Sequence, residues 1–296
     1  MARRRPPNTH GLAVVDKPAG VTSHDVVGML RRRFGERQVG HAGTLDPDAT
    51  GVLLVGVGRC TRLLRFLTDL GKTYTGEVVF GTTTDSLDST GVVTGTFEMS
   101  GLSEELVRSM IATHLVGAIE QIPPMVSAVR VDGRRLHELA REGVEVDRAP
   151  RPVTVHRFEV EPTADPLVYG IEVQCSKGTY IRTLADDLGR LCGGGAHLRG
   201  LRRTAVGGFT VADALGPDDV ELMSLPDAVR DYEAVGVDAE TAVMVAHGRV
   251  LPMFAGHDGE PGPWAVLGPD GDLLAMYERA GSATVKPAVV VAPQSV

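Results

Sequence analysis

The sequence has few cysteines and no long hydrophobic run. Its 296 residues include three cysteines, Cys60, Cys175 and Cys192, which lie far apart and lack metal-ligand spacing. We therefore expect reduced, mostly buried thiols rather than disulfides or a metal centre. No apolar run approaches the length that crosses a bilayer, and no apolar segment follows the basic N-terminus as in a signal peptide. These absences predict a cytoplasmic protein with no membrane partner.

An overall excess of positive charge is also absent. The net charge of −8 by itself argues against a nucleic-acid partner. However, residues 211–296 contain 4 Lys and Arg against 14 Asp and Glu, whereas the preceding residues contain 26 against 24. Arginine clusters near the N-terminus suit phosphate contacts, although a single cluster is as often a solvated helix face. The clusters are Arg3–Arg5, Arg31–Arg33 with Arg37, and Arg59 with Arg62 and Arg65.

The hydrophobic and turn patterns predict an α+β fold. Strands and helices do not alternate as regular βαβ units, which argues against a doubly wound parallel sheet. Short apolar runs joined by Gly-Pro turns near the C-terminus favour a small β-barrel or sandwich. The expected strands are 12–15, 72–80, 153–160, 169–175, 264–267, 273–277 and 289–291. The expected helices are a segment capped by Ser23, 61–70, 104–115 capped by Ser103, and 180–191.

Changes in composition along the chain suggest three parts. Residues 1–10 are expected to form a disordered basic arm, and residues 11–235 one large domain. Within this domain, the arginine-rich segment 124–152 reads as an exposed excursion from the main sheet, with one helix near Arg134–Arg141. Residues 236–296 are expected to form a small β-rich domain.

The most informative segment is the loop Gly40–Gly51, which holds Asp46 between glycines and just before Pro47. Such a loop restricts the backbone in order to aim a side chain or to make a difficult turn. The ordinary interpretation is an Asp that caps a turn. The spacing of Asp46, Asp48 and Thr50 also matches the nucleophile motif of aspartyl-phosphate phosphohydrolases. That motif requires a hydrophobic strand just before it and a parallel βαβ scaffold, and both are missing.

Four further segments accompany this loop: Asp16–Ser23, Gly71–Tyr74, Ser176–Leu184 and Leu198–Thr204. In this order, the five segments resemble the pseudouridine synthases, specifically the bacterial tRNA pseudouridine-55 synthase branch. The resemblance runs from about Leu12 to Phe209 and includes the excursion, which is similar to that family's thumb-like insertion. It implies a pseudouridine synthase fold, with a large, mostly antiparallel mixed sheet flanked by helices and a small C-terminal PUA-like barrel. It also implies isomerisation of uridine 55 in the T loop of tRNA.

The resemblance implies catalysis without cofactor or metal, by Asp46, Tyr74 and Arg182. Asp46 matches the family's essential aspartate, which either attacks C1′ or removes a proton from C2′; the sequence leaves both routes open. Desolvation raises the pKa of a buried carboxylate, and the Arg182 guanidinium is the candidate cation that offsets this rise by pairing with Asp46. Tyr74 would stack on the flipped base and handle the C5 proton. Outside the resemblance, a Tyr packed on its strand is an equally good interpretation.

Further residues are expected to bind the substrate. His41, Tyr180 and Leu201 would contact the flipped-out region, and Lys17 fits the first motif, more as a support of the catalytic loop than as a reactive group. Asp48 is expected to point to solvent. We expect a monomer that binds the T arm of tRNA, and an added tRNA-folding chaperone role stays open. The arginines expected at the RNA backbone are Arg130, Arg134, Arg135, Arg141, Arg202 and Arg203.

Overall fold

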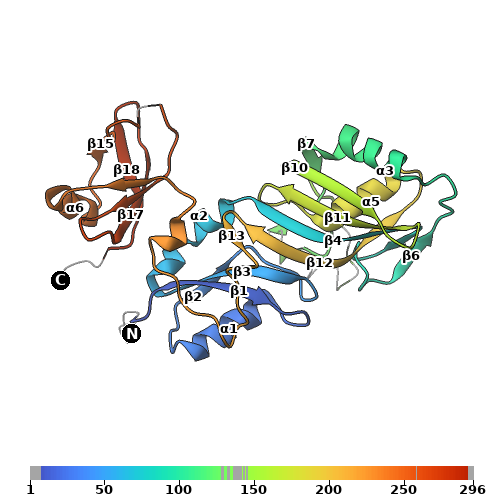
Figure 1. Cartoon of the computed structure of the whole chain (residues 1–296), viewed down its shortest axis with the longest axis horizontal. Coiled ribbons are helices and arrows are strands. Elements are labelled where there is room, and N and C mark those ends of the chain that lie inside the picture. Colours follow the sequence, from blue (N-terminus) through green and yellow to red (C-terminus); the bar gives the residue numbers. More distant parts are fainter. Residues whose placement is uncertain are drawn as a thin grey trace. The chain divides into compact units, whose positions relative to one another are not determined.

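The computed structural model describes residues 8–127, 130–131, 134–135, 142, 144, 146–257 and 259–292. The chain divides into two compact units (Figure 1). The first contains Met1–Pro47, Gly51–Asp69 and Val206–Val296, and the second contains Asp48–Thr50 and Leu70–Ala205. The predicted basic arm lies mostly outside the described residues. None of the helices in the described part of the chain is long and apolar enough to cross a membrane.

The N-terminal part of the first unit is built on strand β3 (Thr50–Val57), which is buried along nearly its whole length. Strands β1 (Gly11–Lys17) and β2 (Val39–Ala42) both pair with β3 in the antiparallel sense. Helix α1 (Ser23–Arg33) places an apolar stripe against the sheet. Its three buried apolar residues are Val26, Val27 and Leu30, as the sequence predicted.

The cap of helix α1 differs from the prediction by one residue. Thr22, not Ser23, is the N-cap: its hydroxyl accepts a hydrogen bond from the Asp25 N–H at 3.0 Å. The Asp25 carboxylate accepts in return from the Thr22 N–H at 2.9 Å, which completes a capping box. The hydroxyl of Ser23 is therefore available for a contact with another segment.

The predicted helix over 61–70 is two elements, the 3₁₀ turn η1 (Gly58–Leu63) and helix α2 (Leu64–Asp69). The arginines on this segment contact the chain's own C-terminal part rather than standing free for an anionic partner. Backbone carbonyls accept hydrogen bonds from two of them, and the third forms an ion pair. The contacts are Arg59 Nη1 to Val291 O (3.0 Å), Arg62 Nη1 to Val290 O (2.9 Å) and Arg65 Nη2 to Glu278 Oε2 (3.7 Å).

The C-terminal part of the first unit contains a five-stranded sheet, which confirms the strands predicted at 264–267 and 273–277; the third, predicted at 289–291, begins earlier, at Thr284, and ends at Val290. Helix α6 (Ala239–Ala246) and this sheet enclose a small apolar core around Trp264 and Tyr277. In sheet order the strands are β14 (Ala234–Gly236), β16 (Trp264–Leu267), β17 (Leu273–Arg279), β18 (Thr284–Val290) and β15 (Leu251–Pro252).

The second unit is an antiparallel sheet with helices. Its strands follow the order β12 (Ala196–Val206), β4 (Lys72–Phe80), β11 (Val168–Cys175), β10 (Arg151–Pro162) and β7 (Gly117–Gln121). Helix α3 (Glu104–Met110) continues as a π-helical turn over Ile111–Leu115, and α5 (Ile181–Leu191) packs beside it. A short hairpin joins β5 (Thr82–Thr84) to β6 (Val93–Thr96). The predicted α+β class is confirmed, and Ser103 caps α3 as expected.

The arginine-rich insertion contains a two-stranded ladder of β8 (Arg130–Val131) and β9 (Arg134–Arg135). The helix predicted near Arg134–Arg141 is wrong at its first two residues, because they pair as a strand. Its remaining residues, 136–141, lie outside the described residues. Where the insertion rejoins the sheet, the Arg148 guanidinium donates to the Pro123 carbonyl at 3.1 Å, which ties the two ends of the insertion together.

Candidate active site

Asp46 lies in the loop that joins β2 to β3. Gly43 has a φ of 81°, a backbone conformation that residues with a Cβ rarely adopt, which explains a glycine at the entry to the loop. Asp46 is half-buried, whereas Asp48 is exposed, as the sequence predicted. The loop therefore turns its two carboxylates into different surroundings.

Both neighbours of Asp46 are held by the segment from Lys17, the last residue of β1, to Ser23, the first residue of α1. The Ser23 hydroxyl accepts from the Leu45 N–H at 2.9 Å and donates to the Leu45 carbonyl at 3.1 Å. On the other side, the Pro47 carbonyl accepts from the Lys17 ammonium at 2.8 Å and from the Gly20 N–H at 3.0 Å. These four bonds restrict the backbone on each side of the aspartate.

Lys17 is fully buried, which is unusual for a lysine. Its ammonium donates to three backbone carbonyls, those of Pro18 (2.9 Å), Val21 (2.7 Å) and Pro47 (2.8 Å). Three acceptors match its three N–H donors, which compensates for burial of the charge. This geometry supports the loop-holding interpretation of Lys17. It does not support direct contact between its ammonium and the substrate.

Arg182 lies in the first turn of α5 and is only 4% exposed. Its guanidinium donates from Nη1 to the Ser86 carbonyl and from Nη2 to the Val126 carbonyl, both at 2.9 Å. Nη1 also lies 3.6 Å from the Asp88 carboxylate. The Arg182 cation is thus held by groups from two loops that are distant in sequence.

Asp88 and Gln121 are two residues of this site that sequence reasoning missed. Asp88 sits in a loop where the hydroxyls of Ser86 and Thr90 donate to its carboxylate at 2.7 and 2.6 Å. The density of Thr, Ser and Asp between Gly81 and Gly91 was the only local sign of this polar loop. Gln121 ends an ordinary strand, and nothing in its local sequence sets it apart.

Gln121 holds Tyr180, the residue that precedes α5. The Gln121 side chain is buried; its carbonyl oxygen accepts from the Tyr180 N–H at 2.9 Å, and its amide donates to the Tyr180 carbonyl at 3.2 Å. Tyr74 lies in β4 opposite Val173 and is 9% exposed. Leu201 lies in β12 beside Gly76, which is two positions from Tyr74 along β4. The second unit therefore contains all four residues; Tyr74 and Leu201 lie on the neighbouring strands β4 and β12, and Tyr180 and Arg182 lie at the start of α5.

The predicted RNA-contacting arginines fall into different environments. Arg203 is buried, and this burial does not fit a contact with an RNA backbone. Arg202 is half-buried and donates to the Thr50 hydroxyl at 3.3 Å. Arg134 is exposed and pairs with Glu142 at 2.5 Å. Arg130 and Arg135 lie in the ladder of the insertion, and Arg141 lies outside the described residues.

His41 lies half-buried in β2, opposite Val55 of β3. Asp46 belongs to the first unit and Arg182 to the second, so the ion pair between them stays a prediction. Within the described residues, no group of three His, Cys, Asp or Glu side chains is placed to hold a metal ion. Burial raises the pKa of the Cys60 thiol to about 12 and that of the Cys175 thiol to about 11, so neither is a nucleophile at neutral pH.

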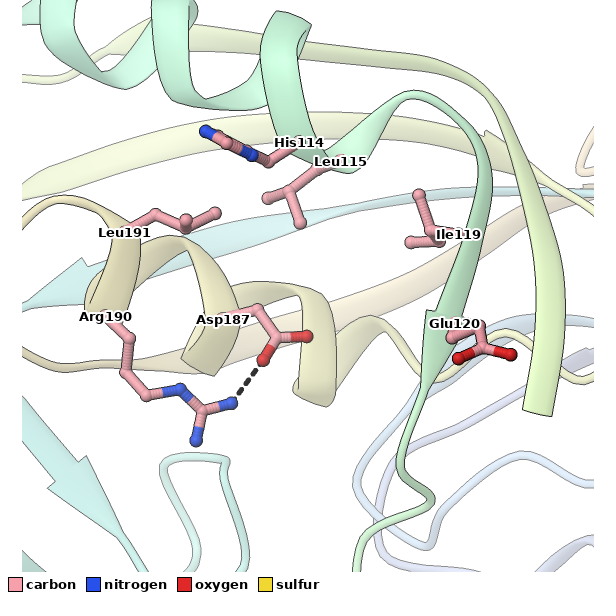
Figure 2. A pocket seen from close by; sticks show the side chains of 7 residues that line it. All are labelled: His114, Leu115, Ile119, Glu120, Asp187, Arg190 and Leu191. Atoms are coloured by element: carbon pink, nitrogen blue, oxygen red, sulfur yellow. Dashed lines mark hydrogen bonds and ion pairs between the residues drawn. The ribbon is translucent and has the colours of Figure 1, made fainter. Parts of the chain in front are cut away.

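A surface pocket of about 400 Å³ lies elsewhere on the second unit (Figure 2). None of the predicted site residues lines it. Its one arginine, Arg190, is already paired with Asp187 and, at 3.0 Å, with Asp186. The lining residues are His114, Leu115, Ile119, Glu120, Asp187, Arg190 and Leu191.

Family models match this chain along most of its length. Residues 31–181 match the model described as "TruB family pseudouridylate synthase (N terminal domain)". The chain belongs to the TruB family of pseudouridylate synthases. Residues 182–243 match the "tRNA pseudouridylate synthase B C-terminal domain", and residues 232–292 match "tRNA Pseudouridine synthase II, C terminal". The protein is therefore an enzyme of an isomerase family, and its C-terminal sheet is consistent with a PUA-like domain.

Similar proteins support this membership. A protein of Arthrobacter sp. (strain FB24), named tRNA pseudouridine synthase B, is 40% identical over 96% of this chain and 97% of its own. The protein of the same name from Rhodococcus jostii (strain RHA1) is 44% identical over 92% of this chain and 90% of its own. A solved structure, "Crystal Structure of a Cbf5-Nop10-Gar1 Complex", has a TM-score of 0.73 at 23% identity, covering 96% of this chain and 85% of that chain. This last likeness concerns the fold.

Proposed function

We propose that this protein isomerises uridine 55 in the T loop of tRNA to pseudouridine, with Asp46 as the essential carboxylate. The observation that carries the proposal is the set of four hydrogen bonds that hold the backbone on each side of Asp46, which we call the bracket. Asp46 is the one glycine-framed aspartate of the five motifs. Relatives named tRNA pseudouridine synthase B, at 40–44% identity over nearly the whole chain, support tRNA as the substrate.

The reaction breaks the N1–C1′ bond of uridine, turns the uracil over and joins C5 to C1′. C5 loses a proton and N1 gains one, so the change involves neither water nor net oxidation. Asp46 would either attack C1′, forming a covalent intermediate, or remove the C2′ proton to give a glycal. Both routes require an ionised carboxylate whose position is restrained, and a buried cation such as that of Arg182 favours the ionised form.

The other residues have supporting roles in this proposal. Tyr74, on β4, would stack on the extruded base and accept the C5 proton, and Tyr180 and Leu201 would line the same pocket. His41 would hold the flipped-out region of the RNA. The exposed arginine Arg134 of the insertion would contact the RNA backbone.

The direct test is to incubate the protein with unmodified tRNA and map pseudouridine at single-nucleotide resolution. Modification of uridine 55 alone is the expected result. A tRNA with cytidine at position 55 serves as the control, since it should stay unmodified. Pseudouridine at other positions, with none at 55, would contradict the proposed site on the RNA.

A further inference from the structure

We infer that Ser23 is a positioning residue for Asp46, acting through the backbone of Leu45. The inference rests on the proposed function, because it assigns a role in the reaction for which Asp46 is the essential carboxylate. Ser23 is 1% exposed and lies in the first turn of α1, 23 positions before the aspartate. Its hydroxyl cannot contact solvent or substrate from this buried position.

The Ser23 hydroxyl makes two bonds to a single residue. It accepts from the Leu45 N–H at 2.9 Å and donates to the Leu45 carbonyl at 3.1 Å. The Leu45 carbonyl belongs to the peptide group that carries the Asp46 N–H. The Ser23 hydroxyl therefore restricts rotation of the peptide plane that immediately precedes Asp46, and so the direction in which the carboxylate leaves the backbone.

The two sides of the bracket differ: the Pro47 side has several restraints, whereas the Leu45 side depends on Ser23. On the far side of Asp46, the Pro47 carbonyl has two donors, Lys17 and Gly20, and the proline ring restricts φ. On the near side, the described contacts of the Leu45 backbone come from Ser23. Loss of that hydroxyl leaves a buried N–H and a buried carbonyl to find other partners, which favours rearrangement of the loop.

A helix-capping role does not explain Ser23. The cap of α1 is Thr22, whose hydroxyl accepts from the Asp25 N–H at 3.0 Å, and Thr22 is exposed. The two neighbouring hydroxyls thus have different roles: that of Thr22 caps the helix, and that of Ser23 holds the Asp46 loop. This division provides a matched control, since Thr22→Ala removes one hydroxyl from the same turn without removing any bond to Leu45.

The experiment compares Ser23→Ala, Ser23→Thr and Thr22→Ala in the full-length protein, at a temperature well below the melting transition of all three. For Ser23→Ala we expect kcat on tRNA to fall by about 10-fold or more, with KM within about twofold, because a small misplacement of a reacting group lowers the rate without weakening binding. Ser23→Thr restores the hydroxyl and should recover most of kcat. Thr22→Ala should lower the melting temperature and leave kcat unchanged.

Amide hydrogen exchange gives a readout independent of activity. The Leu45 N–H should exchange faster in Ser23→Ala than in the parent protein and at the parent rate in Thr22→Ala. The inference is overturned if Ser23→Ala retains the parent kcat, or if Thr22→Ala lowers kcat as much. A parent protein that makes no pseudouridine at uridine 55 would instead overturn the proposed function, which keeps the two failures distinct.

Discussion

Arg182 shows what the environment of a single residue adds to a motif. A charge with 4% exposure is unfavourable unless its donors are satisfied, and here the carbonyls of Ser86 and Val126 and the carboxylate of Asp88 surround the guanidinium. The motif predicts that an arginine follows Tyr180 and Ile181. It contains no information about these three partners, since they lie between 56 and 96 positions away.

Asp46→Asn is the most decisive substitution at the residue scale. It preserves the shape of the side chain and removes the charge that either route requires, so we expect kcat to fall by about 10³-fold or more. Binding of tRNA should persist, because phosphate contacts do not depend on this carboxylate. Pseudouridine mapping and a filter-binding assay measure the two quantities. Residual pseudouridine at the parent rate would remove Asp46 from its assigned role.

The Asp46→Asn variant also tests whether the protein has a tRNA-folding activity separate from catalysis. If the protein also folds tRNA, Asp46→Asn should still accelerate the folding of a misfolded tRNA while making no pseudouridine. Loss of both activities together would indicate that no separate folding activity exists.

Arg182→Lys should be milder but substantial. The guanidinium donates to two carbonyls at once, whereas an ammonium on a shorter stem cannot reproduce this planar fork. Loss of one charged hydrogen bond costs about 1.5–3 kcal/mol, which corresponds to about 10- to 100-fold in kcat if the cation acts in the transition state. Single-turnover rates on tRNA measure this effect. An unchanged rate would mean that the fork is structural only.

At the scale of elements, the bracket around the Asp46 loop depends on the order β1, turn, α1. The turn brings Lys17, Gly20 and Ser23 within reach of Leu45 and Pro47, so one short segment holds both neighbours of the aspartate. The arginines of η1 illustrate the opposite case. Their spacing suits a phosphate, yet Arg59 and Arg62 donate to backbone carbonyls at the end of the C-terminal sheet.

The insertion is the element expected to contribute most to RNA affinity. Replacing Arg130, Arg134, Arg135 and Arg141 with glutamine should weaken binding to all tRNAs alike and flatten the dependence of log K on log salt. The slope should change by about 0.7–0.9 for each phosphate that the substituted protein no longer neutralises. Titrations at several salt concentrations measure it.

A control for these substitutions needs exposed arginines that lie outside the insertion. Glutamine at the buried Arg203 or at Arg202 is not equivalent, whereas the exposed Arg157 and Arg108 provide the comparison. Their replacement should leave the salt slope as it is in the parent protein. An unaltered slope in the insertion variant would exclude the insertion as a backbone contact.

The C-terminal sheet carries a pH-dependent contact. A hydrogen bond to the Ala255 carbonyl, together with the Glu233 carboxylate 2.8 Å away, raises the pKa of His257 above its ordinary 6.5. Glu260 and Arg279 are the other charged groups beside it, and Arg279 donates to the carbonyls of both His257 and Glu260. Protonation therefore favours the folded state. The stabilisation is fully present below about pH 6.5 and is lost as the pH rises through the raised folded value.

The only tryptophan of the chain, Trp264, reports on this region, since its ring lies 6.1 Å from that of His257. The melting temperature followed by its fluorescence should be higher at pH 6 than at pH 8.5. His257→Gln should abolish most of this difference. If the substituted protein keeps the full pH dependence, another group is responsible.

At the scale of the whole molecule, charge is divided along the chain. Residues 211–296 carry 14 acidic against 4 basic side chains, and this segment includes the sheet that Arg59 and Arg62 contact. Such a division suits an RNA partner that approaches the remainder of the chain. It makes the C-terminal sheet a poor candidate for phosphate contacts.

Metal removal tests the whole enzyme against the rejected phosphohydrolase interpretation. The isomerisation proposed here is expected to need no metal, whereas an aspartyl-phosphate phosphohydrolase requires magnesium. We expect the initial rate of pseudouridine formation to be unchanged in EDTA, with tRNA folded in monovalent salt at low temperature. A control without chelator and a circular dichroism spectrum of the tRNA verify its fold. A rate that collapses and returns with magnesium would argue for a metal-dependent step.

The family, the α+β class and the candidate aspartate could be proposed from the sequence alone, whereas strands such as β3 and β12 were not predicted. The three that were predicted depend on local features: the glycines and proline around Asp46, the alternation of β4 and the capping residues of the helices act within a few positions of the residues they place. The class of the C-terminal part was similarly readable from short apolar runs between Gly-Pro turns.

Only the tertiary structure decided what individual polar side chains do. Ser23 reads as a helix cap, Arg203 as a phosphate ligand and Arg62 as a surface cation, and in each case burial or a distant partner changes the assignment. Arg62 bonds a carbonyl 228 positions away, a separation over which local patterns contain no information. The physical reason is general: backbone propensities are short-range, whereas the satisfaction of a buried donor or charge depends on whichever segments the fold brings beside it.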